Sequence, residues 1–445
     1  SGVGNLFRPG TMTGAVPQFM PADRGQHFYG ISWRNIAPSL GFAWVVPKMD
    51  LPVLSWLAGE GGTVIRSGYS IATIREGMNI PISLWGSNQG RTVSMSVAPG
   101  TFPVEFGAPG SVWFRDPTLP ARAEPDRPQY PLAVLPGNGV NDFDPRLKMG
   151  YAQSWTFSVQ RELTKSTVLD VRYVGNRGTR LWRQINLNEV NIFENGFLEE
   201  FRIAQENLRI ARLSNPASVN FGNQGLPGQR PIPIIQTALV LTSDTNYALN
   251  LERGQAGSLA SSIATNTTRM DNLVRAGYPP NFFRVNPTTG SGGAWLVING
   301  ADSSYHALQV EVRRRMSRGL LVQGSYAWSK SLSNMQASSS VLESQPTTLR
   351  NYALGKGPSP WDLRHGLKLN FIYELPFGGS RTWLSGFQNP VLKKLVEGWE
   401  IAGVSRLQSG SSELLTGRAT FNQNDNGVVF QNLTAKDYQN MVKLR

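Results

Sequence analysis

Apolar and polar residues alternate along several short segments of the chain, and this period of two constrains the fold more than any other feature. The clearest example covers residues 151–161, where Trp155, Phe157 and Val159 alternate with polar neighbours. A second alternating segment, 167–173, follows after a short turn. Together the two segments predict an antiparallel hairpin whose strands have one apolar face and one polar face.

The same pattern recurs in three further pairs of segments, 40–46 with 65–71, 308–312 with 320–328, and 367–373 with 399–407. The connections alternate in length: they are short or moderate after Val46, Glu162, Arg315 and Leu375, and long after Arg75, Gly175, Lys330 and Ser409. Bacterial outer-membrane barrels have this asymmetry, with short periplasmic turns and long extracellular loops. We therefore predict an all-β fold, an antiparallel transmembrane β-barrel of which about eight or more strands are present.

The predicted organisation alternates barrel hairpins with long loops. The chain divides into an N-terminal loop or strand segment of the barrel at 1–38, hairpins at 39–75, 151–175, 305–330 and 363–409, extracellular loops at 76–150, 176–304 and 331–362, and the start of a further extracellular loop at 410–445. Within the loop 176–304, apolar residues at helical spacing predict a short amphipathic helix near 197–211, of about four turns. Loops of this length are usually functional or disordered, so this helix either packs over the barrel mouth or contacts a ligand.

Trp and Tyr side chains fall on the apolar faces of the predicted strands, mostly near strand ends, which is typical of the membrane–water interface. The predicted lipid-interface aromatics are Trp44, Tyr69, Tyr151, Trp155, Tyr173, Tyr326, Trp328, Tyr373 and Trp399. The opposite faces suit a wet or plug-filled lumen, and we predict that Gln160, Glu311, Lys368 and Arg406 face it. Alternation alone does not separate a membrane barrel from a soluble sandwich, so a soluble β-sandwich array that binds carbohydrate stays as an alternative.

Composition and motifs exclude several kinds of site. The chain has no cysteine, and its three histidines, His27, His306 and His365, lack carboxylate neighbours at metal-ligand spacing. The net charge of +13 is scattered along the chain, which argues against nucleic acid as a partner. The segment 422–427 is not an EF-hand, because it opens with Asn and has Leu433 where the bidentate Glu belongs; a looser calcium site there is left open. Phosphate-binding loops and nucleophile elbows are absent from the sequence, so we expect no enzyme activity, no cofactor and no metal site.

A series of short segments, spread along the chain from about residue 35, forms a recognisable set. They are 143–147 (FDPRL), 154–163 (SWTFSVQREL), 173–179 (YVGNRGT), 195–198 (NGFL), 225–229 (GLPGQ), 305–310 (YHALQV), 325–331 (SYAWSKS), 362–365 (DLRH) and 373–378 (YELPFG). In order and spacing this set resembles the Oar-like TonB-dependent receptors, a family abundant in Acidobacteria.

The resemblance implies the outer membrane of a Gram-negative bacterium and a plugged barrel of about 22 strands. It also implies a regulatory domain and a plug, neither of which is visible in this sequence, so we expect an internal or C-terminal portion of the protein. The implied partners are outer-membrane lipid, the TonB–ExbB–ExbD system acting through the plug, and a scarce, bulky solute of unknown identity. The implied function is import of that solute after its capture by the extracellular loops. A non-transporting structural or adhesive barrel, whose loops bind a partner, is the main alternative.

Overall fold

The computed structural model describes residues 18–19, 27, 29–30, 33, 35–47, 62–74, 79–90, 130–134, 139–286, 293–335, 348–378, 383 and 389–410. Most of the predicted segment 1–38 and nearly all of 410–445 lie outside the described residues. The segment 422–427, considered above for calcium, lies outside them as well.

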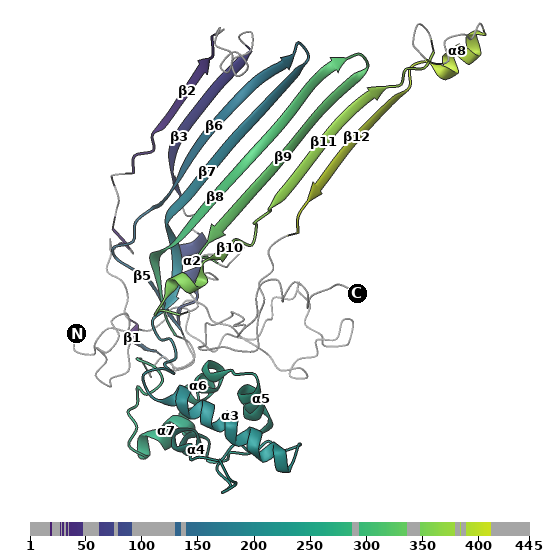
Figure 1. Ribbon diagram of the computed structural model, residues 1–445. Coiled ribbons are helices and arrows are strands. Elements are labelled where there is room, and N and C mark those ends of the chain that lie inside the picture. Colours follow the sequence, from purple (N-terminus) through teal and green to yellow (C-terminus); the bar gives the residue numbers. More distant parts are fainter. Residues whose placement is uncertain are drawn as a thin grey trace, which may run out of the picture.

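A long antiparallel sheet forms the main body of the structure (Figure 1). Eight of its strands follow one another in sequence order. These are β2 (Ser39–Val45), β3 (Thr63–Ile74), β6 (Gly150–Thr164), β7 (Thr167–Asn186), β8 (Ala294–Ser317), β9 (Leu320–Ser333), β11 (His365–Glu374) and β12 (Glu400–Gln408). The predicted hairpins are confirmed, because β2 pairs with β3, β6 with β7, β8 with β9, and β11 with β12. Within the described residues the sheet is open, with β2 and β12 at its edges.

The two ends of the sheet differ (Figure 1). At one end, which we call the turn rim, Ser317 pairs with Leu320 and the chain reverses through Arg318 and Gly319. Both of these residues have positive φ, 53° and 77°, as a type I′ hairpin turn requires. The β6–β7 connection, residues 165–166, is equally short. At the opposite end, the helical rim, β7 leads into a group of helices.

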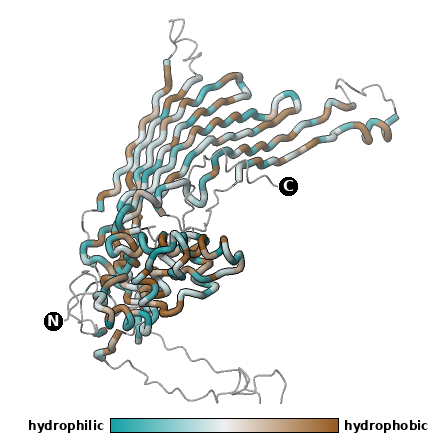
Figure 2. Tube along the Cα trace, turned by 60° about the horizontal axis from the view of Figure 1, so that its bottom comes forward, coloured by the Kyte–Doolittle hydropathy of each residue, from teal (hydrophilic) through white to brown (hydrophobic). Residues whose placement is uncertain are grey.

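Five helices, which follow β7 and precede β8 in the sequence, pack together beyond the helical rim (Figure 1). They are α3 (Phe197–Ser214), α4 (Pro233–Leu239), α5 (Thr245–Glu252), α6 (Ala256–Ala264) and α7 (Thr267–Arg275). We call residues 187–286 the helical unit. Each helix contributes to one hydrophobic core, through side chains such as Phe201, Ile235, Leu251, Leu259 and Leu273. In Figure 2, hydrophobic and hydrophilic residues alternate along the strands but form broader groups in this unit.

The helical unit corrects the prediction of a single short helix in this segment. The predicted helix near 197–211 is present as α3, which extends to Ser214, but the four helices that follow were not predicted. They contain only seven to nine residues each, so hydrophobic periodicity gives a weak signal for them. Among the described residues, no helix combines the length and the apolar character needed to cross a membrane.

Strands β7 and β8 reach further toward the helical rim than the sequence predicts. The predicted loop 176–304 actually begins with the end of β7, which continues to Asn186, and finishes with the start of β8 at Ala294. Residues 182–186 are all buried, so the alternation of buried and exposed positions that marks a strand is lost there. The buried side chains include Trp182, which packs against Phe143 and Leu84.

Smaller elements lie around the long strands. They are β1 (Gln18–Phe19) paired with β4 (Leu132–Ala133), β5 (Val140–Phe143) parallel to β8, β10 (Gly357–Pro358) paired with β9, the helices α2 (Asn79–Gly86) and α8 (Pro390–Val396), and the 3-10 helix η3 (Tyr352–Gly355). In Figure 1, α2, β5 and β10 lie toward the helical rim, whereas α8 lies at the turn rim. The helical rim therefore carries most of the added structure.

Candidate functional site: the two faces of the sheet

The residues predicted to face a lumen lie in one row across the sheet. In cross-strand order from β6 to β12, the row is Gln160, Asp170, Glu311, Ser325, Lys368 and Arg406. Directly paired residues of neighbouring strands share a face, so the structure brings all four predicted residues together and adds Asp170 and Ser325. We call this side of the sheet the polar face.

The acidic groups of this row are neutralised within the sheet, whereas its two cations are not. Asp170 and Glu311 each pair with an arginine two positions along its own strand, at N–O distances of 3.0 Å and 2.6 Å. Lys368 and Arg406 are direct cross-strand neighbours, and among the described residues neither side chain has a hydrogen bond or ion pair. Positive charge therefore remains free in the middle of the polar face.

A pocket of about 410 Å³ opens over the same row. Asp170, Gln309, Glu311, Lys368 and Arg406 all line it. The volume falls in the range of sites that hold small molecules. The polar face is therefore hollowed and charged where the predicted lumen residues meet.

The opposite side of the sheet, the apolar face, is exposed. One row across all the long strands consists of Trp44, Ile65, Val159, Val171, Val310, Tyr326, Leu367 and Leu407. Leu40, Phe157 and Trp328 on this face are 70%, 49% and 53% exposed. Soluble monomers rarely expose a continuous apolar surface of this kind, whereas the outer surface of a membrane barrel requires it.

Barrel geometry relates positions on this face to height along the barrel axis. Strands in barrels tilt by about 40°, so a line of equal height shifts by about one residue from each strand to the next. The hairpin ends show the direction of the shift. The row through Ile65 and Leu367 lies beside the end of the β2–β3 pairing at Val64, but far from the end of the β11–β12 pairing at Glu374. Compared with the row of directly paired residues, the residues at equal height therefore lie about one position closer to the turn rim on each successive strand from β2 to β12.

Eight of the nine predicted interface aromatics lie on the apolar face of the paired strands. Trp399 directly precedes β12 and continues its pairing, because its carbonyl accepts a hydrogen bond from the Leu375 N–H at 2.8 Å. With the shift of about one residue per strand, the nine fall mainly at two heights. Those nearer the helical rim are Tyr69, Trp155, Tyr173, Tyr326 and Trp328, and those nearer the turn rim are Trp44, Tyr373 and Trp399. Tyr151 lies beyond the first group, closer to the helical rim. The arrangement has the form of two aromatic girdles around an apolar band.

Two of the three histidines form matching pairs with tyrosines on the apolar face. Tyr173 Oη lies 2.8 Å from His306 Nδ1, and Tyr326 Oη lies 2.8 Å from His365 Nδ1. Each pair joins neighbouring strands, so neither could be found from sequence spacing without the register. His27 lies outside any described helix or strand.

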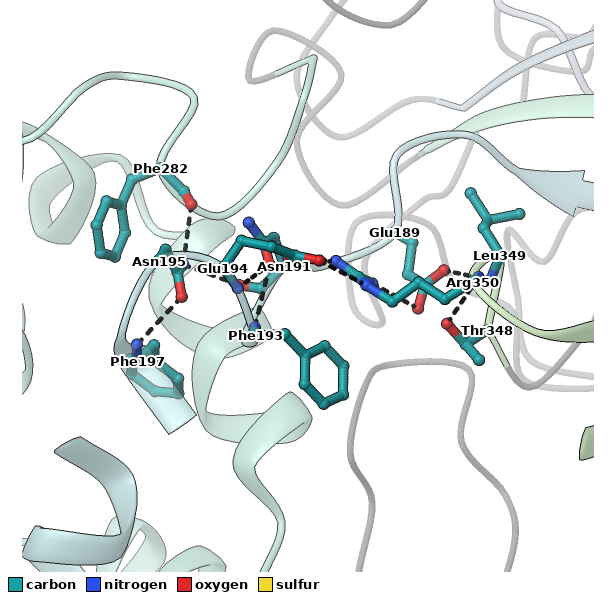
Figure 3. A network of polar contacts seen from close by, with 10 residues as sticks. All are labelled: Glu189, Asn191, Phe193, Glu194, Asn195, Phe197, Phe282, Thr348, Leu349 and Arg350. Atoms are coloured by element: carbon teal, nitrogen blue, oxygen red, sulfur yellow. Dashed lines mark hydrogen bonds and ion pairs between the residues drawn. The ribbon is translucent and has the colours of Figure 1, made fainter. Parts of the chain in front are cut away.

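Arg350 joins the entrance of the helical unit to the segment before β10 (Figure 3). Its guanidinium donates to both carboxylate oxygens of Glu194, at 2.9 Å and 2.5 Å, and to Asn191 Oδ1 at 3.2 Å. The carboxylate of Glu189 lies 3.6 Å from Arg350 Nη1 and accepts a hydrogen bond from the Leu349 N–H. The Arg350–Glu194 contact lowers the pKa of Glu194 and raises that of Arg350. The sequence gives no signal for this network, because Arg350 is more than 150 residues from Glu194 and Asn191.

Buried ionisable side chains hold the helical unit together internally. Glu200 of α3 accepts hydrogen bonds from the N–H groups of Ile234 and Ile235, at 3.0 Å and 2.6 Å, where α4 begins. Burial raises the pKa of Glu200 despite these bonds. Arg284 donates to Ser261 Oγ of α6 at 3.1 Å, and burial lowers its pKa to about 10. The unit is therefore an ordered structure with fixed internal contacts.

An antiparallel meander with an exposed apolar face and a charged, hollowed face defines the wall of a membrane β-barrel. The sequence profile of the family described as "Outer membrane beta barrel domain" matches residues 3–442, and the chain belongs to this family. The protein is accordingly located in the outer membrane. No curated protein matches the chain.

Several solved structures match the chain at low similarity. They include the outer membrane transporter YddB from Escherichia coli (8% identity, TM-score 0.31, covering 72% of this chain and 25% of that chain). The ferripyoverdine receptor of the outer membrane of Pseudomonas aeruginosa bound to ferripyoverdine has 8% identity and a TM-score of 0.25 over 76% of this chain and 20% of that chain. The alcaligin outer membrane receptor FauA from Bordetella pertussis has 7% identity and a TM-score of 0.24 over 78% and 27%. This chain spans less than a third of each, and likeness at this level carries no argument about function.

Proposed function

We propose that this chain forms part of the wall of an Oar-like TonB-dependent receptor, which binds a scarce, bulky solute on its outer side and imports it. The polar face carries the proposal, because its charged pocket of about 410 Å³ opens where a transported solute would pass. The sequence segments that resemble Oar-like receptors support the same assignment. In this function the energy would come from the TonB–ExbB–ExbD system, acting through a plug.

The difference between the two rims supports an orientation in the membrane. Outer-membrane barrels have short periplasmic turns and long extracellular segments. The tight turn at Arg318 and Gly319 belongs to the turn rim, and the helical unit belongs to the other. In the proposed orientation the helical unit is extracellular, the apolar face contacts lipid, and the predicted interface aromatics lie at the two membrane surfaces.

The helical unit is the proposed capture element for the solute. Long ordered loops on barrels are usually functional, and this one has its own hydrophobic core. Its surface also exposes large apolar side chains, with Leu213 73%, Val240 67% and Leu241 72% exposed. Val240 has a φ of 64°, a conformation that β-branched residues rarely adopt and that clusters at binding sites.

A deletion of the helical unit tests the proposal. Leu187 N–H donates to the Ala294 carbonyl at 2.8 Å, and Asn186 pairs with Trp295, so a two-residue Asn-Gly turn can replace residues 188–293. The full-length protein, this deletion variant and the full-length protein in a tonB-deficient host would be compared for accumulation of labelled ferric siderophores, oligosaccharides and peptides. Import predicts that one solute class accumulates only with the intact protein and an active TonB system.

The adhesive alternative predicts a different result in the same cells. Binding of a surface or partner protein would require the helical unit but would be unchanged in the tonB-deficient host. Loss of partner binding on deletion, with no solute class accumulating in any strain, would overturn the proposed import.

A further inference from the structure

Charged side chains on the apolar face are confined to its two borders. Near the turn rim the border carries Arg161 and Arg314, and near the helical rim it carries Arg177 and Lys330. The paired positions of the described strands place no Asp or Glu on this face. At these paired positions every formal charge is therefore positive, and none lies in the band between the borders. Asp302 of β8 is exposed and lies four residues beyond His306, further toward the helical rim.

The border near the helical rim contains one basic side chain from each of four neighbouring strands. They are Arg177 of β7, His306 of β8, Lys330 of β9 and His365 of β11, and we call them the basic border. His306 and Lys330 are direct cross-strand neighbours. With the shift of about one residue per strand, all four lie at nearly the same height, just beyond the nearby aromatic group. At about 4.8 Å between strands, the border is roughly 15 Å wide.

Tyrosines hold the two imidazoles of the basic border in the same way. Besides the hydrogen bonds of 2.8 Å, the rings of Tyr173 and His306 are inclined by 19° with centroids 6.2 Å apart, and those of Tyr326 and His365 by 21° at 6.2 Å. Trp155 lies beside His306, at a centroid distance of 6.1 Å. The repeated geometry gives the border fixed positions for its donors.

The two long cations of the border have no acidic partner in the described part of the chain. Arg177 and Lys330 are both exposed, and neither has a side-chain hydrogen bond or ion pair there. A cation at the edge of a hydrocarbon layer is stabilised by an anionic headgroup, and Arg and Lys both bind phosphate through charge-assisted hydrogen bonds. Directly below the border, Phe157, Leu308 and Trp328 offer an apolar surface for acyl chains.

We propose that the basic border binds the phosphate groups of an anionic lipid in the outer leaflet of the outer membrane. Arg177 and Lys330 neutralise the phosphate charge, His306 and His365 complete the set of polar groups, and the aromatic rings below contact the lipid chains. A lipid is favoured over a soluble anion, because the same face continues into the apolar band that the membrane covers. The inference rests on the proposed orientation, with the helical rim outward, but not on import.

The test compares the two borders of the full-length protein. Purified protein in non-ionic detergent, stripped of lipid, is titrated with bis-phosphorylated lipid A and separately with phosphatidylcholine, and bound lipid is counted by native mass spectrometry. The variant carries Arg177→Gln with Lys330→Gln, and the matched control carries Arg161→Gln with Arg314→Gln. Heat-modifiable gel mobility checks that each protein is folded; Lys330→Gln alone replaces the double variant if that variant fails to fold.

We expect lipid A to bind the Arg177→Gln, Lys330→Gln variant roughly 30-fold more weakly than the parent, about fivefold for each basic side chain. Lys330→Gln alone should give the fivefold loss, and the turn-rim control should retain the parental affinity. Phosphatidylcholine should not distinguish the proteins. Equal binding of lipid A by all of them, or an equal loss in the control, would overturn the proposal. Displacement of lipid A by millimolar inorganic phosphate would also overturn it, since the border would then be a site for a soluble anion.

Discussion

At two cross-strand positions an aromatic ring lies directly over a glycine. Trp155 pairs with Gly175, and Phe371 pairs with Gly403. A Cβ added at Gly175 would lie 2.1 Å from Trp155 Nε1, and one at Gly403 would lie 2.6 Å from a Phe371 ring carbon. Glycine is required at both positions because the ring occupies the space of a side chain, an arrangement that covers a weak point in a strand.

Substitution of Gly175 should therefore destabilise the sheet. Gly175→Ala would push the Trp155 ring from its place, at a cost of about 1–3 kcal/mol, which is typical of overpacking. The expected result is a lower temperature for conversion of the compact gel band to the unfolded band. Gly366→Ala is the matched control, because a Cβ there has no neighbour within 4 Å. An equal effect of both substitutions would show that the Trp155 contact is not the cause.

Removal of an unpaired cation from the polar face should instead stabilise the sheet. Lys368 lies directly across from Arg406, and like charges at such positions destabilise a sheet. Lys368→Glu should raise the free energy of unfolding by about 0.2–1 kcal/mol by creating a cross-strand ion pair, measured by urea denaturation in detergent. Lys368→Gln separates loss of repulsion from gain of attraction and should fall between the two. A loss of stability in both variants would indicate that an anion already bridges the pair.

The face on which Gln160, Glu311, Lys368 and Arg406 lie could be predicted one residue at a time, because a period of two assigns each side chain to a face; that this face lines a lumen stays a prediction. Their positions in one row across the sheet could not be predicted, because the row depends on the register between strands. The same holds for the two Tyr–His pairs. The sequence places His306 and His365 in predicted hairpins and gives neither a carboxylate neighbour at metal-ligand spacing. Only the pairing of the strands brings a tyrosine hydroxyl to each imidazole ring.

Among the elements, the hairpins were predictable and the short helices were not. Local signals for the helices do exist in the sequence. Asp244 accepts hydrogen bonds from two N–H groups at the start of α5, Asn266 does so from one at the start of α7, and Pro233 opens α4. These are common N-terminal residues of helices, but helices this short form only when tertiary packing supports them.

Arg350 should control how firmly the helical unit is attached to the β9–β11 connection. Arg350→Gln removes the bonds to Glu194 and Asn191, and we expect limited proteolysis near residue 190 to become several-fold faster in intact cells. The control is Arg209→Gln, which breaks an Arg–Glu pair confined to α3. Similar proteolysis in both variants would argue against a connecting role for Arg350.

The same contact predicts a pH dependence with a definite sign. Arg350 lowers the pKa of Glu194 below its ordinary value of 4.5, so the contact contributes fully above pH 4.5 and is lost as pH falls through the lowered pKa. The parent protein should therefore approach the proteolysis rate of Arg350→Gln only in acid below this range, measured with an acid-active protease. Because the Glu194 side chain is 61% exposed, solvent screening keeps the effect on overall stability small.

At the scale of the whole molecule, the helical unit should fold without the sheet. Its core draws on all five helices, and its chain enters and leaves through neighbouring residues of β7 and β8. Residues 187–293 expressed alone should be soluble, helical by circular dichroism and cooperative in thermal unfolding. Leu259→Ala, which truncates a fully buried side chain, should lower the free energy of unfolding by about 2–5 kcal/mol. A fragment without a cooperative transition would contradict the independent core.

The wall architecture was predictable from the chain because each hairpin carries its own pattern and its own turn. The lengths of the central strands were not, because both faces of β7 are buried near the helical rim. Among the described strands the sheet ends at β2 and β12, so these strands define the two faces of the wall but not how the barrel closes.

The length of β8 bears on what can approach the protein from outside the cell. Its 24 residues extend about 80 Å, or roughly 60 Å of height at a tilt of about 40°, against an apolar band about 25 Å tall. In the proposed orientation the central strands extend beyond the outer leaflet and hold the helical unit at a distance from the membrane surface. Antibodies and bacteriophages could then reach this unit on living cells, and a foreign epitope inserted there would be displayed to them.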